Sequence, residues 1–289
     1  MSRRNPLKKL LRAVALEPGL HQHSRHDGIE SDDQTPLRAE LFSASQMEQH
    51  GATLAAAHVL SSSAPQNRLL QRLDDNEQVL VETCDLLTAA VKSKQRIAPA
   101  AEWLLDNFYL IEEQIRTARQ HLPKGYSRGL PRLAQGPSRG LPRVYDIALE
   151  AISHGDGRVD SATLGRFVTA YQTVTPLTLG ELWAIPIMLR LALIENLRRA
   201  GSRITTARIH LNRAQDWANR MMEVAESDPK SLIVVIADMA RSDPPMATPF
   251  VAELARRLQG QSAALALRLT WIEQRLSEVG LTNDQWVQT

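Results

Sequence analysis

The sequence is poor in cysteine and in aromatic residues. Cys84 is the one cysteine among 289 residues, so no disulfide can form within the chain. We expect this cysteine to be a buried, inert thiol on a helix. Only 4% of the residues are aromatic, while leucine and alanine dominate the 43% that are apolar. This composition favours helices over sheet.

Long apolar runs are also missing. The most apolar stretch, residues 182–194, contains Pro186 and Arg190 and is shorter than the ~20 residues needed to cross a bilayer. The basic N-terminus lacks the hydrophobic region and the cleavage site of a secretory signal. We therefore expect a chain that does not span a membrane.

Motifs that carry catalysis or bind metal are absent too. The sequence has no glycine-rich phosphate loop after a strand, no HExxH, no GxSxG and no cysteine or histidine pair at zinc spacing. His21, His23 and His26 could bind a metal, but we interpret them as a solvated polar run in a tail. The formal charge of +2 is too small to indicate nucleic acid. We expect no catalytic residue, cofactor, metal centre or nucleic-acid partner.

What the sequence does contain is helical periodicity. In residues 97–122, apolar residues recur in steps of three and four, which predicts one amphipathic helix at the centre of the N-terminal half. Its predicted inward-facing residues are Ile97, Ala101, Leu104, Phe108, Ile111, Ile115, Ala118 and Leu122. Trp103, Leu105 and Tyr109 widen this stripe, which indicates neighbours on two sides.

The same periodicity recurs through most of the chain and predicts an all-α fold. We expect a multi-helix bundle or an irregular helical array of about nine or ten helices, joined by a connector rich in glycine, proline and arginine. The predicted parts are a disordered tail (1–34), an N-terminal helical part (35–122), the basic connector (123–142) and a C-terminal helical part (143–289).

Several helix ends can be read directly. Asp160 is placed to cap one helix, and Thr178 with Glu181 has the spacing of a capping box for the next. Pro186 falls inside that helix. Either the helix kinks there, or a short first segment ends and a second begins at the proline.

The connector holds the strongest local charge in the sequence. Its segment SRGLPR occurs twice, at 127–132 and 138–143, and no acidic residue lies between Glu113 and Asp146. We predict a surface that contacts an anion or a protein partner; the alternative is a connector whose arginines pair with acidic helix faces. The candidate contact residues are Arg128, Arg132, Arg139 and Arg143. Arg190, in an apolar helix, is predicted to form a buried ion pair rather than to bind a ligand.

Long blocks of the chain resemble the N-terminal region of the cyclic β-1,2-glucan synthases. The first block, AAEWLLDNFYLIEEQIR, is the centre of the predicted amphipathic helix. All the blocks lie at 36–50, 100–116, 122–133, 142–160 and 170–199. The family has a single passage of the connector type, whereas here SRGLPR is duplicated.

The resemblance implies a very large bacterial inner-membrane glucosyltransferase that builds and closes β-1,2-glucan from UDP-glucose. It places this chain, as a fragment, in a helical accessory region at the cytoplasmic face, outside the catalytic modules. The partners it implies are the remaining modules of the synthase; the charge of the basic connector separately indicates anionic lipid headgroups as a partner. A second class of function stays open, that of an independent helical adaptor whose basic connector binds an anionic partner.

Overall fold

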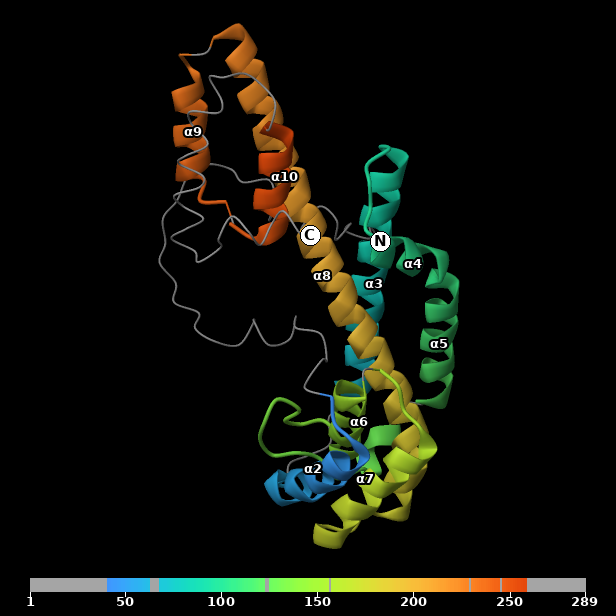
Figure 1. Cartoon of the computed structure of the whole chain (residues 1–289). Helices are drawn as coiled ribbons and strands as arrows, with labels where there is room; N and C mark the ends of the chain where they lie inside the picture. Colours follow the sequence, from blue (N-terminus) through green and yellow to red (C-terminus); the bar gives the residue numbers. More distant parts are fainter. Residues whose placement is uncertain are drawn as a thin grey trace. The chain divides into compact units, whose positions relative to one another are not determined.

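The computed structural model describes residues 41–62, 68–122, 125–155, 157–228, 230–244 and 246–258, and it confirms the all-α fold (Figure 1). Within these ranges the chain forms nine α-helices and no strand, only two isolated β-bridges. The helices are α2 (Ala44–Ala57), α3 (Arg68–Lys92), α4 (Pro99–Asp106), α5 (Phe108–His121), α6 (Arg143–His154), α7 (Ser161–Val174), α8 (Leu179–Ser227), α9 (Leu232–Arg241) and α10 (Thr248–Leu258). None of these helices combines the length and the apolarity that a membrane crossing requires.

The chain divides into two compact units, Met1–Arg203 and Ile204–Thr289, and the division falls within α8. The domain boundaries predicted from the sequence stay a prediction. Their first part, 1–34, lies outside the described residues, as do the histidines of the predicted tail.

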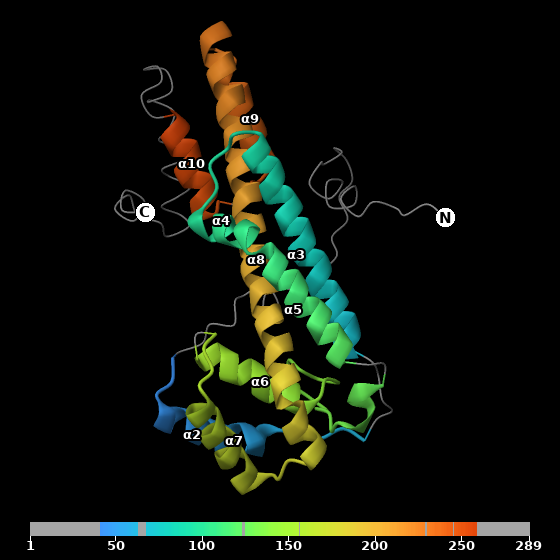
Figure 2. The same cartoon turned by 90° about the vertical axis from the view of Figure 1, so that its right-hand side faces the viewer.

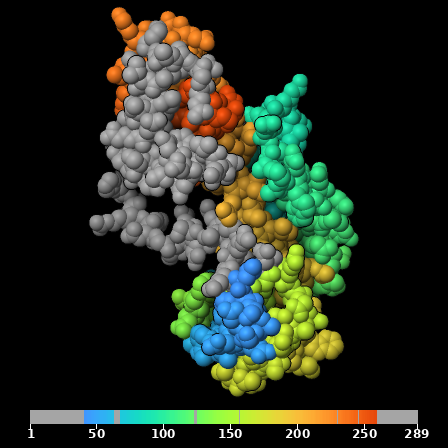
Figure 3. Space-filling model, in the orientation of Figure 1, coloured from blue at the N-terminus to red at the C-terminus, as the bar shows by residue number. Residues whose placement is uncertain are grey.

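In the first unit, α2, α6 and α7 share one apolar core (Figure 2). Phe167 and Tyr171 of α7 are fully buried in it, beside Ile147 of α6 and Met47 of α2. The space-filling view shows α2 lying against the surface formed by α7 (Figure 3). The helix starts follow local chemistry: Asp160 accepts a hydrogen bond from the Thr163 amide at 2.8 Å, as predicted.

The predicted single helix over 97–122 is wrong, because the chain breaks at Asn107 into α4 and α5, which run in different directions (Figure 1). Asn107 leaves helical geometry, with φ −106° and ψ 8°, and its side-chain amide donates to the Trp103 carbonyl at 2.7 Å. An asparagine side chain that bonds the preceding turn competes with the backbone hydrogen bonds of a continuous helix.

The predicted apolar stripe nevertheless survives the break. Its members Ala101 and Leu104 are buried on α4, and Ile111, Ile115 and Ala118 are buried on α5. The prediction that further apolar residues widen the stripe is wrong for two of them, which are exposed. These are Trp103 (54% exposed) and Tyr109 (64%).

The long helix α8 continues through Pro186. This excludes the alternative in which a second helix begins at the proline, while a kink at Pro186 stays a prediction. Proline lacks the amide hydrogen that would bond the carbonyl of Leu182, so one hydrogen bond is missing from an otherwise regular ladder.

The second unit has a separate core formed by the C-terminal part of α8 with α9 and α10. Phe250, Leu254, Leu232 and Met221 are almost completely buried in it. α10 begins at Thr248, with Pro249 as its second residue. α9 begins at Leu232, directly after its N-cap residue Ser231.

Candidate functional site

The basic connector is an ordered loop within residues 125–142. Its Ala134 amide donates to the Val59 carbonyl at 2.8 Å, and the Ser61 amide donates to the Arg132 carbonyl at 2.8 Å. Leu133 also exchanges backbone hydrogen bonds with Leu141 and Gly140 farther along the same loop. The connector is therefore fastened both to itself and to the segment that follows α2.

The duplicated sequence adopts the same turn twice. Each SRGLPR is preceded by a glycine with a left-handed backbone, Gly125 at φ 90° and Gly136 at φ 82°. In both copies the arginine amide donates to this glycine's carbonyl, at 2.9 Å for Arg128 and 3.1 Å for Arg139. The copies thus share the turn at the start of SRGLPR, but they differ at its glycine: Gly140 has a left-handed backbone with φ 81°, whereas Gly129 ends a short 3₁₀ helix.

Burial repeats in the same way. Arg128 and Arg139, the first arginine of each copy, are exposed, whereas Arg132 and Arg143, the last arginine of each copy, are buried. The four predicted contact residues therefore fall into two classes. Only Arg128 and Arg139 present their guanidinium groups on the surface of the connector.

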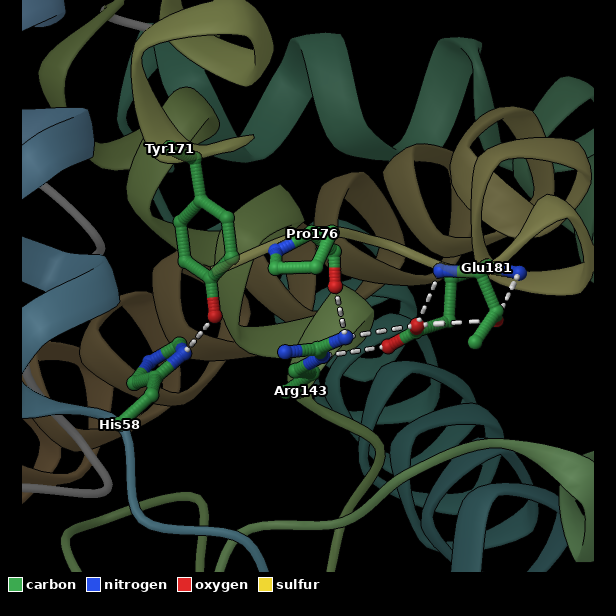
Figure 4. A network of polar contacts seen from close by, with 6 residues as sticks. His58, Arg143, Tyr171, Pro176 and Glu181 are labelled. Atoms are coloured by element: carbon green, nitrogen blue, oxygen red, sulfur yellow. Dashed lines mark hydrogen bonds and ion pairs between the residues drawn. The ribbon is translucent and has the colours of Figure 1, made fainter. Parts of the chain in front are cut away.

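Arg143 enters a buried ion pair at the start of α6 (Figure 4). Its Nε donates to Glu181 Oε1 at 2.6 Å, and its Nη2 donates to Glu181 Oε2 at 2.9 Å and to the Pro176 carbonyl at 2.8 Å. The pKa of Arg143 is raised, chiefly by the hydrogen bonds that it donates to Glu181. Burial alone would raise the pKa of Glu181, but its bonds to Arg143 and Thr178 outweigh this and lower it.

The same Glu181 completes the predicted capping box of α8. Its Oε2 accepts from the Thr178 amide at 2.8 Å and from the Thr178 hydroxyl at 2.9 Å, while the Glu181 amide donates to that hydroxyl. The Glu181 carboxylate thus accepts hydrogen bonds both from Thr178 at the start of α8 and from Arg143, the last arginine of the second SRGLPR copy.

A second network of polar contacts lies beside Arg143. The Tyr171 hydroxyl lies 2.8 Å from Nδ1 of His58, whose Nε2 lies 3.1 Å from Asp146 Oδ2 (Figure 4 shows the first contact). Arg143 lies over the Tyr171 ring, 5.9 Å from its centroid. These contacts hold together the end of α2, the start of α6 and the end of α7.

Glu195 of α8 is the centre of a third charged cluster. It is fully buried and accepts hydrogen bonds from Arg72 of α3 and from Arg198 and Arg199 of its own helix, at 2.8–3.0 Å. Burial would raise the pKa of Glu195, but the charge of Arg72 and the bond from Arg198 outweigh it and lower the pKa to about 2. The carboxylate is held ionised by its guanidinium neighbours.

Arg190 lies half-buried on α8, and the described residues show no ion pair for it. Its neighbours at helical spacing form an exposed apolar stripe: Leu179 is 71% and Trp183 76% exposed, and Leu193 is 40% exposed. Pro186 is exposed on the same face. Steps of three and four place all five residues along one side of the helix.

Comparison with known proteins finds a relative among the glucan synthases. Over 246 residues, the chain is 30% identical to the cyclic beta-(1,2)-glucan synthase NdvB of Rhizobium meliloti (strain 1021). The chain is related to a segment of a glucan synthase. The match covers 84% of this chain and 8% of that protein. No protein-family model matches the chain.

In this relative of a glucan-synthase segment, the three charged clusters lie inside the fold and join helices that are distant in sequence. Sequence reasoning found Arg143 and Glu181 separately but did not pair them. It missed Glu195 and His58 altogether. A glutamate directly after the apolar run 182–194 was a usable signal for Glu195, because a buried carboxylate requires a cationic partner.

Proposed function

We propose that this chain is a non-catalytic helical accessory and scaffold region of a cyclic β-1,2-glucan synthase-like glucosyltransferase. The supporting observation is the relationship itself, which covers 84% of the chain but 8% of the synthase. A segment of that size leaves the great majority of the synthase to carry the reaction of UDP-glucose to cyclic β-1,2-glucan. In this proposal the chain lies at the cytoplasmic face of the inner membrane.

The α8 stripe is the docking face in this proposal. Leu179, Trp183, Pro186 and Leu193 are exposed apolar residues on one side of a helix whose opposite side is buried. Apolar side chains at such spacing suit a helix or groove of another module, and a tryptophan is a frequent energetic anchor in interfaces. The occupant we propose is a remaining module of the synthase.

The test uses a glucan synthase from which the homologous segment has been deleted. Incubated with UDP-glucose, the isolated chain should form no β-1,2-glucan, whereas adding it to the deleted synthase should restore product. A deleted synthase that is fully active by itself, or glucan made by the chain alone, would overturn the proposal.

A paired variant tests the docking face. Trp183→Asp should abolish restoration, because it places a charge in an apolar interface. Ile233→Asp is the matched control, since Ile233 is also apolar and 63% exposed but lies on α9. Equal restoration by both variants would show that the α8 stripe is not the docking face.

The second candidate function is an independent adaptor, favoured by the exposed pair Arg128 and Arg139. Replacing both with glutamine should then weaken binding to vesicles that contain anionic phospholipid, most clearly at low salt. Arg158→Gln, at another exposed arginine, is the control. Unchanged vesicle binding by the double variant would remove this candidate.

A further inference from the structure

We propose that His50, Glu150 and His154 form a Zn²⁺ site that joins α2 to α6. Nε2 of His50 lies 2.7 Å from Oε2 of Glu150, and Nε2 of His154 lies 3.3 Å from the same oxygen. The three ligand atoms all lie within 4.8 Å of one another. This inference is independent of the proposed function.

The sequence and the packing place these three groups together. Glu150 and His154 are four residues apart on α6, so their side chains leave the same face of the helix. His50 comes from α2, which is fixed against α6 and α7 by the shared core. Because 100 residues separate His50 from Glu150, the cluster cannot be seen as a local motif.

Aromatic packing orients the two imidazoles. The Phe42 ring stacks on His154 with centroids 3.7 Å apart and an interplanar angle of 9°, and it meets His50 edge-on at 5.3 Å. The Phe42 amide also donates to the His154 carbonyl at 3.3 Å. The rings are therefore held before any ion arrives, which reduces the entropy lost on binding.

The donor set matches zinc in type, and the two separations between histidine and glutamate atoms are close to those of a zinc site. Two imidazole nitrogens and one carboxylate oxygen are a common set of three protein ligands, with water in the fourth position. Tetrahedral bonds of ~2.0–2.1 Å separate neighbouring ligand atoms by about 3.4 Å. The His154–Glu150 separation already has this value, and the His50–Glu150 separation needs to open by less than an ångström.

The surroundings leave room for the water. The His50 and Glu150 side chains are 23% and 30% exposed, while His154 is 9% exposed. The ion would replace the hydrogen bond between His50 and Glu150 and the ion-pair contact between His154 and Glu150. A plain hydrogen-bonded cluster is the competing explanation, and the experiment separates the two.

The experiment uses the full chain carrying His21→Gln, His23→Gln and His26→Gln, so that the histidine-rich N-terminal sequence cannot supply the binding. After treatment with chelator, titration with Zn²⁺ should show one bound ion per chain and a rise in melting temperature. Co²⁺ in place of Zn²⁺ should give the intense visible absorption of a tetrahedral site.

Glu150→Gln and His50→Ala test the ligands on this background. Replacing a residue that only hydrogen-bonds to a metal ligand weakens metal binding by roughly 10–100-fold. Because Glu150 and His50 would bind the ion directly, each variant should weaken Zn²⁺ binding by more than that. His121→Ala, at an exposed histidine of α5, should bind like the parent. Glu150→Gln keeps the size of the side chain, so its fold, checked by circular dichroism, should persist.

Two results would overturn the site. The first is a background chain that shows neither a Zn²⁺-dependent rise in melting temperature nor Co²⁺ absorption. The second is equal Zn²⁺ binding by Glu150→Gln and its parent. Either outcome would leave His50, Glu150 and His154 as a hydrogen-bonded cluster.

Discussion

Arg143 and Glu181 form a two-point ion pair from which water is almost completely excluded. The arginine side chain is 3% exposed and the glutamate is fully buried, and both guanidinium contacts are 2.9 Å or shorter. A pair of this kind contributes little by its presence but costs much when one partner is removed, because the other charge stays buried. It fixes the end of the connector to the start of α8.

Glu181→Ala should therefore lower the free energy of unfolding by about 3–5 kcal/mol. Glu48→Ala, which removes an exposed ion pair with Arg166 at 3.6 Å, should change it by less than about 1 kcal/mol. Urea denaturation followed by circular dichroism measures both. Similar losses in the two variants would mean that the Arg143 charge finds solvent once Glu181 is gone.

Stability in acid should depend on Glu195. Its pKa is lowered in the folded chain from 4.5 to about 2, so the unfolded chain binds the proton more tightly. The stabilisation is fully present above pH 4.5 and is lost as the pH falls toward 2. Unfolding titrations of wild type and Glu195→Gln should differ in slope within this window. Parallel slopes would contradict the lowered pKa.

The repeated turn offers a matched pair of glycines. Gly140 has φ +81°, and an added Cβ would lie 2.8 Å from Nη1 of Arg68. Gly129, at the same position of the first copy, has open space around it. Gly140→Ala should cost about 1–2 kcal/mol for the left-handed backbone, and Gly129→Ala should be nearly neutral. The melting temperatures of the two variants test this prediction. Equal lowering by Gly140→Ala and Gly129→Ala would contradict the structural difference between the two copies.

Leu104 and Tyr109 lie on either side of the break at Asn107. Leu104 is 3% exposed, so Leu104→Ala should lower stability by about 2–5 kcal/mol. Tyr109→Ala, at an exposed position, should stay within about 0.5 kcal/mol of wild type. Chemical denaturation of both variants tests whether α4 belongs to the core; a neutral Leu104→Ala would show that it does not.

Local chemistry could be predicted from the sequence, and long-range pairing could not. The capping residues Asp160, Thr178 and Glu181 act within three residues of their partners, so their spacing was sufficient. Cys84 is buried as predicted, and burial raises its pKa to about 11. The break at Asn107 was missed because the apolar periodicity continues through it.

The partners of the charged residues depend on tertiary packing. Glu195 meets Arg72 across 123 residues of sequence, and no spacing rule connects them. For the connector, composition indicated an exposed basic surface, whereas the turn exposes only one arginine in each copy. Which arginine is buried follows from the backbone of the turn and cannot be read from charge alone.

The duplication also bears on how this loop can change in length. The copies are offset by 11 residues, from Ser127 to Ser138, so removal of 129–139 would join Arg128 directly to Gly140 and restore one unbroken GYSRGLPR. That shorter loop would still begin with a left-handed glycine and still deliver Arg143 to the first turn of α6. Loss of one or two residues would instead shift Arg143 away from Glu181. Removal of a whole copy therefore keeps the sequence that leads to the buried ion pair, but it also removes Arg132 and Ala134, whose backbone bonds fasten the loop to the segment after α2.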